Sequence, residues 1–214
     1  MAPEERFLPR FAAEPPHEGL PGGRWLERLE RELLTAALAL EDEQPDLGEP
    51  GRILWYPDRT WHGRTYVPAT ARTAGGFELF GYVRYLPGDG DGEPGEFSTW
   101  VDFTDQTAEQ NPQWRLDLCD EVIGRWRGEQ GAVAAMTLIW GHPLVSEGHV
   151  VTAELADLAV DQCELVQERF TMIAPDDYRG DLLMIKLFDS RGRELASESL
   201  YDADEQDGEG EHPG

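Results

Sequence analysis

The sequence predicts a mainly β protein, an antiparallel β-sandwich or open barrel of about eight strands preceded by one N-terminal amphipathic helix. Three observations lead to this fold class. Short aromatic and β-branched segments bounded by Gly or Pro recur from residue 52 onward, a single earlier segment has helical periodicity, and the chain closes with a hairpin pattern. An α+β arrangement stays open, because two later segments also fit helices.

The N-terminal helix is predicted over residues 24–40. Oppositely charged residues stand four apart on one side, and the acidic stretch EDEQPDLGEP that follows contains Pro45, which a helix interior excludes. The helix therefore has one packing face and one solvated face. Its apolar residues, at spacings of three and four, are Trp25, Leu29, Leu33, Ala36, Ala37 and Leu40.

The β pattern begins directly after this helix. Strands are predicted at 52–57, 64–69, 77–86, 97–103 and 131–141, from their aromatic and β-branched content and from the turn residues between them. The C-terminal hairpin pairs 182–188 with 193–201 through the turn DSRG, in which Gly192 suits a positive φ.

Two segments fit both helical and strand periodicity. Over 113–127 the large apolar residues recur every four positions but also share one parity, and the aromatic content favours strands. Over 150–170 the acidic residues recur at three and four, which predicts a helix with an acidic stripe, while a β arrangement stays open.

The chain divides into three parts by composition. Residues 1–22 form a Pro-rich arm that we expect to be flexible, and residues 23–201 form a single β-rich domain. Residues 202–214 contain six acids and no Lys or Arg, a composition that predicts a disordered acidic tail.

The charge balance limits the classes of partner. The chain has 43 Asp plus Glu against 18 Lys plus Arg, for a net charge of −25. Phosphate backbones and anionic lipid headgroups repel such a chain, so neither nucleic acid nor a membrane is expected as a partner. A cationic protein surface is the complementary partner.

The remaining composition predicts a cytoplasmic protein. The sequence has no apolar run of membrane-spanning length, and its N-terminus lacks the apolar segment of a secretion signal. Cys119 and Cys163 are too few for a disulfide framework and have no CxxC spacing, so two reduced thiols are expected.

An aromatic block between residues 55 and 103 is the first candidate for a binding site. It holds 11 of the 21 aromatic residues, which would either pack across strands or line a cavity for a sugar or an apolar ligand. Ordinary packing is the more common role of such residues. The candidate ligand-binding residues are Trp55, Trp61, His62, Tyr66, Tyr82 and Trp100.

Motifs for metal binding or catalysis are weak. The interior histidines show neither HxH nor HExxH spacing, so no metal site and no cofactor are predicted. The chain has no GxSxG or GxxxxGK motif and no GxGxxG that leads from a strand into a helix. Clustered acids at 102–109 and the pair at 176–177 would suit acid/base chemistry, but such clusters arise by chance in so acidic a chain.

These observations favour a non-catalytic accessory protein that docks a larger or cationic protein partner, with the arm and the helix adding contact area. The alternative is a sandwich or barrel that binds a small apolar molecule or a sugar, or an enzyme with its pocket in the aromatic block 55–103.

Overall fold

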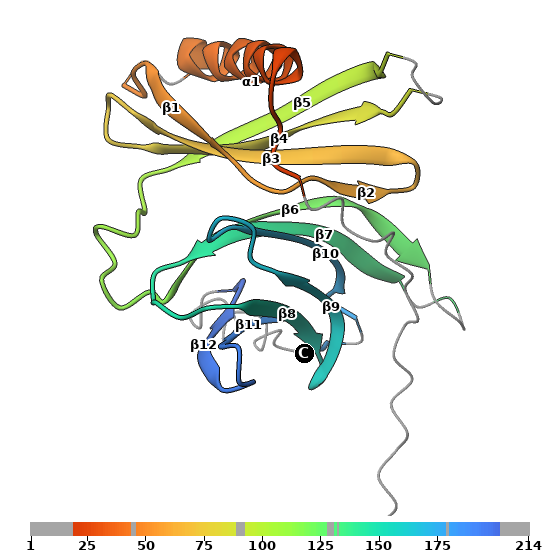
Figure 1. Ribbon diagram of the computed structural model, residues 1–214. Helices are drawn as coiled ribbons and strands as arrows, with labels where there is room; N and C mark the ends of the chain where they lie inside the picture. Colours follow the sequence, from red (N-terminus) through yellow and green to blue (C-terminus); the bar gives the residue numbers. More distant parts are fainter. Residues whose placement is uncertain are drawn as a thin grey trace, which may run out of the picture.

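The computed structural model describes residues 19–43, 46–88, 93–127, 131, 133–178 and 180–201, which form one helix and twelve strands (Figure 1). The helix is α1 (Arg24–Glu43). The strands are β1 (Pro50–Trp55), β2 (Arg59–Trp61), β3 (Arg64–Thr73), β4 (Glu78–Leu86), β5 (Gly95–Thr104), β6 (Leu116–Arg127), β7 (Val133–Pro143), β8 (Val150–Leu155), β9 (Leu158–Glu164), β10 (Phe170–Asp176), β11 (Met184–Phe188) and β12 (Glu194–Ser199).

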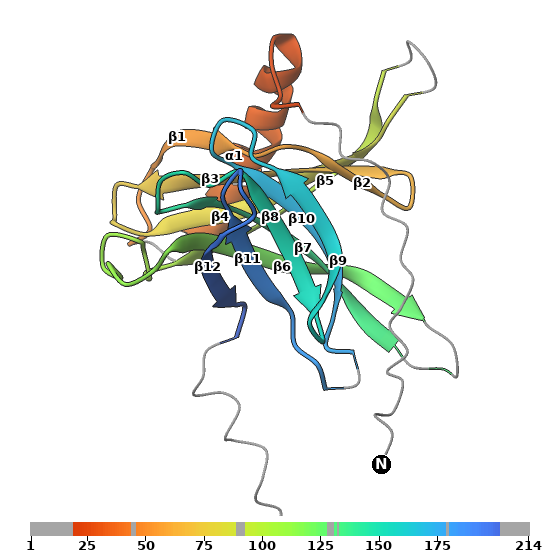
Figure 2. The same cartoon turned by 60° about the horizontal axis from the view of Figure 1, so that its bottom comes forward.

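The strands build three open antiparallel sheets. Sheet A has the order β1-β3-β4-β5, with β2 also paired to β3; sheet B has the order β10-β7-β6; and sheet C has the order β12-β11-β8-β9. Figure 1 shows α1 above sheet A, sheet B below sheet A, and sheet C beneath sheet B. Figure 2 brings sheet C forward. The predicted mainly β fold with one N-terminal helix is thus confirmed, and none of the sheets closes into a barrel.

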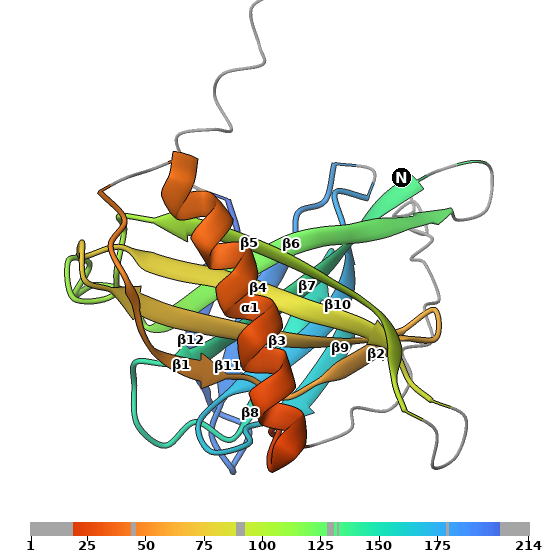
Figure 3. The same ribbon diagram turned by 90° about the horizontal axis from the view of Figure 1, so that it is seen from above.

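The predicted helix is confirmed and lies across the strands of sheet A (Figure 3). Leu29, Leu33 and Ala37 are buried against sheet A, as their spacing requires. The ring of Trp25 meets that of Tyr85 edge-on at 5.0 Å between centroids. The helical stripe therefore covers the sheet and does not form a separate interaction face.

Two further cores separate the sheets. Between sheets A and B lie Tyr66 and Tyr82 from sheet A and Leu138 and Trp140 from sheet B, all buried. The core between sheets B and C is mostly aliphatic, with Phe170 and Tyr178 among its buried residues, and it includes Ile139, whose side chain points to the opposite face from its neighbours in sequence. Sheet B is thus covered on both faces, which explains the nearly continuous apolar sequence of its central strand, β7.

The structure corrects the expected number of strands from about eight to twelve. The additional strands are the short β2 and the run β8, β9 and β10. The strand preference over 113–127 is confirmed for residues 116–127, which form one strand, β6, and not a pair, with a bulge between Val122 and Gly124.

The helix predicted over 150–170 is wrong, because this segment forms β8, β9 and the start of β10. Ala156 and Asp157 adopt φ of 51° and 64° and turn the chain between β8 and β9, and Gln167 and Glu168 do the same before β10. Consecutive positive φ values are typical of tight hairpin turns that normally contain Asn or Gly. The sequence carried neither residue here, so the turns gave no signal.

Most of the predicted arm, residues 1–18, and the whole predicted tail, residues 202–214, lie outside the described residues. Within the described ranges no helix could cross a membrane, since α1 carries charged side chains along its length.

Candidate functional site

The candidate aromatic residues mostly lie in the cores. Trp55 is buried beneath α1, and Tyr66 and Tyr82 are buried between sheets A and B, where Tyr82 stacks on Trp100 at 5.8 Å between ring centroids. The cavity between α1 and sheet A has a volume of about 10 Å³, roughly the space for one water molecule. Cross-strand packing accounts for these positions, and ligand binding by them stays a prediction.

Trp61 and His62 form a corner that joins two sheets. Their rings lie 4.3 Å apart between centroids, at the turn after β2 where His62 has a φ of 50°. The indole of Trp61 covers Gly124 of β6 so closely that a Cβ there would lie 2.3 Å from the ring. The bulged part of β6 therefore accommodates the indole of β2.

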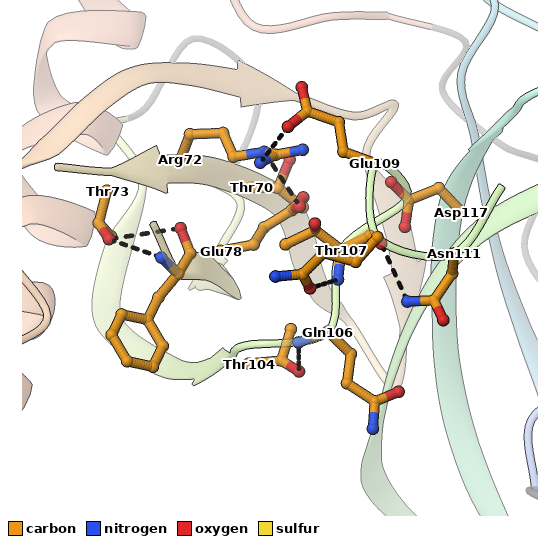
Figure 4. Close-up of polar contacts among 12 residues, drawn as sticks. Thr70, Arg72, Thr73, Glu78, Thr104, Gln106, Thr107, Glu109, Asn111 and Asp117 are labelled. Carbon is orange, nitrogen blue, oxygen red and sulfur yellow. Dashed lines mark hydrogen bonds and ion pairs between the residues drawn. The ribbon is translucent and has the colours of Figure 1, made fainter. Parts of the chain in front are cut away.

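A polar cleft opens at one end of the sandwich formed by sheets A and B. Its volume is about 260 Å³. Glu78 of β4 and Asp117 of β6 line it from the two sheets, and the connection between β5 and β6 closes it with Gln106 and Trp114. Figure 4 shows the polar residues around this end of the sandwich.

Strand register explains why these side chains meet. On sheet A, Arg72 pairs with Glu78, and Glu78 pairs with Thr104 on β5. On sheet B, Asp117 pairs with His142. Because side chains alternate along a strand, these residues share the faces that carry the core between sheets A and B. They extend that core beyond its last aromatic ring as a polar rim.

The connection from β5 to β6 is held by its own hydrogen bonds. Thr107 is buried, and its carbonyl accepts a bond of 3.0 Å from the side-chain amide of Asn111 (Figure 4). At the rim, the guanidinium of Arg72 lies 3.7 Å from the carboxylate of Glu78 and 3.4 Å from that of Glu109. Glu109 is thus the one member of the acidic cluster at 102–109 that reaches this rim through an ion pair.

A chain of polar contacts leads inward from Asp117. Its carboxylate lies 3.9 Å from His142 Nε2, and His142 Nδ1 lies 3.5 Å from the hydroxyl of Tyr56. That hydroxyl also contacts Thr70 Oγ1 at 3.3 Å. Burial raises the pKa of Tyr56 far above its usual range, so this phenol stays protonated at neutral pH.

Burial disfavours ionisation of the two cleft carboxylates, Glu78 and Asp117. Burial, reinforced by the nearby Asp117, raises the pKa of Glu78 to about 6. Burial also raises the pKa of Asp117, although His142 and Arg72 oppose the shift. No Lys or Arg is among the described residues that line the cleft. The cleft therefore holds more potential negative charge than its own cations neutralise.

A second cleft, of about 300 Å³, lies on the opposite face of β6, toward sheet C. Asp120 lines it together with Glu198 of β12 and Tyr201, which comes after that strand. Burial raises the pKa of Asp120 to about 6, with Asp176 and Glu121 adding to the shift. Asp176 itself is buried and accepts a hydrogen bond of 2.6 Å from the Tyr201 hydroxyl.

The two clefts flank one strand. Trp114, Leu118 and Asp120 line both of them. Sequence reasoning missed Glu78, Asp117 and Asp120 because each stands inside a strand and has no motif around it. For Glu78 and Asp117 the available signal was their position near the first residue of a strand, because an acid at the end of an apolar strand marks the place where a core meets solvent.

The described Cys119 and Cys163 form no disulfide, and burial raises the pKa of the Cys119 thiol. Within the described ranges no group of three or more His, Cys, Asp or Glu side chains is arranged to hold a metal ion. Comparison of the chain with protein-family models, with curated proteins and with solved structures finds no match.

Proposed function

We propose that this chain is a non-catalytic binding protein that accepts a basic group of a protein partner in the cleft between sheets A and B. The observation that carries the proposal is the pair of half-buried carboxylates, Glu78 and Asp117, whose side chains are 12% and 14% exposed and which share a cleft lined by no Lys or Arg among its described residues. An incoming guanidinium or ammonium would supply the missing charge.

The rest of the lining supports the same ligand. The indole of Trp114 and the ring of Phe80 line the cleft beside the carboxylates. Aromatic faces attract cations, and guanidinium groups stack on them. The volume of about 260 Å³ suits one long side chain. The strongly acidic chain would also speed the approach of a basic partner.

Two potential nucleophiles near the cleft are not activated. Tyr56 and Cys119 are the nucleophilic groups closest to the polar contacts, and the pKa of each is raised, so neither is activated as an anion. A cytoplasmic location, which the sequence predicts, suits a protein with reduced thiols.

The test is a calorimetric titration of the full chain at pH 7.5 with N-acetyl-argininamide, against the neutral isostere N-acetyl-citrullinamide. We expect the arginine probe to bind and the citrulline probe to bind about tenfold or more weakly. Binding should also weaken as salt rises. Equal binding of both probes, or no binding of either at millimolar concentration, would overturn the proposal.

Two double variants with equal charge change locate the site. Glu78→Gln with Asp117→Asn should abolish the preference for arginine, whereas Glu164→Gln with Glu168→Gln, two exposed residues flanking the end of β9, should leave it unchanged. The same loss of binding in both variants would mean that the general negative field, and not the cleft, attracts the probe.

A further inference from the structure

The strand between the two clefts is an open sheet edge. In sheet B, β7 lies in the middle and β6 forms one edge. It runs over 12 residues from Leu116 to Arg127. Edge strands present unpaired backbone groups, and proteins commonly shorten, charge or cover such strands to prevent association. The bulge after Val122 interrupts β6 only in its second half.

One hydrogen bond at the start of β6 fixes which backbone groups face outward. The carbonyl of Arg115 accepts a bond of 2.9 Å from the N–H of Leu144, so this carbonyl points toward β7, while the N–H of Arg115 donates to the Glu198 carboxylate at 3.2 Å. In an antiparallel ladder this orientation alternates along the strand. Leu118, Asp120 and Val122 therefore turn their N–H and C=O groups away from β7. Leu116 fits the same alternation, because the residue opposite it is Pro143, which has no N–H.

No described residue outside sheet B forms a hydrogen bond with the backbone of Leu118, Asp120 or Val122. The side chain of Val122 is 52% exposed, which leaves this part of the edge accessible. The edge thus has the geometry that an added strand requires.

The position of the two clefts fits an added strand. Side chains of a strand alternate between the two faces of its sheet. A strand paired with the edge of β6 would therefore place one side chain in the cleft of Glu78 and Asp117. It would place the next in the cleft of Asp120 and Glu198. Both clefts are acidic, so both favour Lys or Arg.

Charge also decides between the chain's own tail and a partner. The tail sequence begins directly after Tyr201, which lines the second cleft. It contains six acids and no Lys or Arg. Repulsion from Asp120 and Glu198 disfavours this segment as the occupant.

We propose that β6 binds an extended basic segment of a protein partner by strand addition, with neighbouring Arg or Lys side chains entering the two clefts. The inference rests on the proposed function, and it adds the backbone pairing and the pattern of adjacent basic residues. Peptide recognition of this kind draws affinity from main-chain hydrogen bonds and specificity from pockets for alternate side chains.

The test compares two peptides of the sequence acetyl-Thr-Val-Arg-Arg-Val-Thr-amide on the full chain, one unmodified and one N-methylated at alternate amides. N-methylation keeps the charges but removes the donors for strand pairing. We expect the methylated peptide to bind about tenfold or more weakly, as the loss of two or more hydrogen bonds implies. N-acetyl-argininamide serves as the reference probe.

A variant of the protein gives a second readout. Val122→Pro removes an outward N–H, which an edge strand tolerates, and Val122→Thr keeps it. Only the proline variant should bind the unmodified peptide more weakly, while both variants should bind N-acetyl-argininamide as the wild type does. In the wild type, the peptide should slow hydrogen exchange of the Leu118 and Asp120 amides, with little effect on Cys119, which already pairs with β7.

The outcomes separate the two proposals. If both peptides bind equally, or if only N-acetyl-argininamide binds, strand addition is wrong and the cation cleft stands. If neither the peptides nor N-acetyl-argininamide bind, the proposed function is wrong and strand addition is overturned with it.

Discussion

Asp161 and Glu78 both reach the interior of this fold, but in opposite surroundings. Asp161 on β9 binds the guanidinium of Arg59 and accepts the backbone N–H of Ile173 at 3.0 Å. Glu78 has one guanidinium, that of Arg72, at 3.7 Å, and a second carboxylate nearby. The carboxylate of Asp161 is thus held by close partners in the scaffold, whereas Glu78, with Arg72 at 3.7 Å and a hydrogen bond with Thr70, keeps a raised pKa.

The Asp161 site also joins all three sheets. Arg59 comes from β2 of sheet A, Asp161 from β9 of sheet C, and Ile173 from β10 of sheet B. The side chains of Arg59 and Asp161 are 2% and 9% exposed. Glu78 connects no third sheet, and its cleft opens to solvent. The comparison predicts different responses to mutation at the two places.

The largest expected effect is at the buried ion pair. Asp161→Ala leaves the guanidinium of Arg59 buried without its partner, and we expect the free energy of unfolding to fall by about 3–5 kcal/mol. Urea denaturation followed by tryptophan fluorescence measures this loss. The double variant Arg59→Met with Asp161→Leu should recover part of it, because no buried charge remains although the N–H of Ile173 loses its acceptor. A loss below about 1 kcal/mol for Asp161→Ala would contradict the structural role.

A smaller effect of opposite sign is expected at Glu78. Glu78→Gln should raise the free energy of unfolding at pH 7 by up to about 2 kcal/mol, since a pKa difference of one unit corresponds to about 1.4 kcal/mol. The variant should gain nothing at pH 4. Denaturation of wild type and variant across this pH range provides the measurement, and a destabilised variant at pH 7 would place Glu78 with the scaffold acids.

The sign follows from the raised pKa. In the unfolded chain Glu78 ionises near 4.5, and in the folded chain at about 6. Its contribution to stability is therefore fully present below pH 4.5 and is lost as the pH rises through 6. Asp120, whose pKa rises from 3.8 to about 6, follows the same rule. The cleft acids thus make the folded protein less stable at neutral pH, which is common where residues are retained for binding.

The smallest effect is expected at an exposed ion pair whose charged atoms lie closer together than those of Arg72 and Glu78. Arg64 and Glu96 lie 2.8 Å apart, but their side chains are 33% and 63% exposed. We expect Glu96→Gln to change the free energy of unfolding by less than about 0.5 kcal/mol, because solvent screens the pair. Thermal unfolding at low and high salt measures this. A change as large as that at Asp161 would mean that the distance between the charges, and not their burial, determines how much these acids contribute to the free energy of unfolding.

Local sequence was a good guide to the elements whose own residues carry the signal. The stripe of α1 at three and four positions, the strands β3 to β5 and the final hairpin lie where periodicity placed them. The failure at 150–170 has a local cause, because its turns use residues such as Ala156 and Asp157 at positive φ. The acids there recur at helical spacing only because they lie on two hairpins whose strands and turns place them at those intervals.

The candidate site was much less predictable. Glu78 and Asp117 stand 39 positions apart on different sheets, and only the packing of sheet A on sheet B brings them to one cleft. The aromatic residues that the sequence indicated as candidates for ligand binding mostly pack in the cores, as Tyr66 and Tyr82 do. The composition indicated a cationic partner, but it could not say which of 43 acids would meet it.

The sequence by itself determined the type of most elements, the segment 150–170 excepted, and the sign of the protein's net charge, because backbone preference and formal charge belong to individual residues and their neighbours. Tertiary structure alone decided which acids are neutralised, which are left short of cations, and which strand keeps an open edge. The physical reason is that pKa, desolvation and unpaired backbone groups depend on atoms that are near in space and distant in the chain.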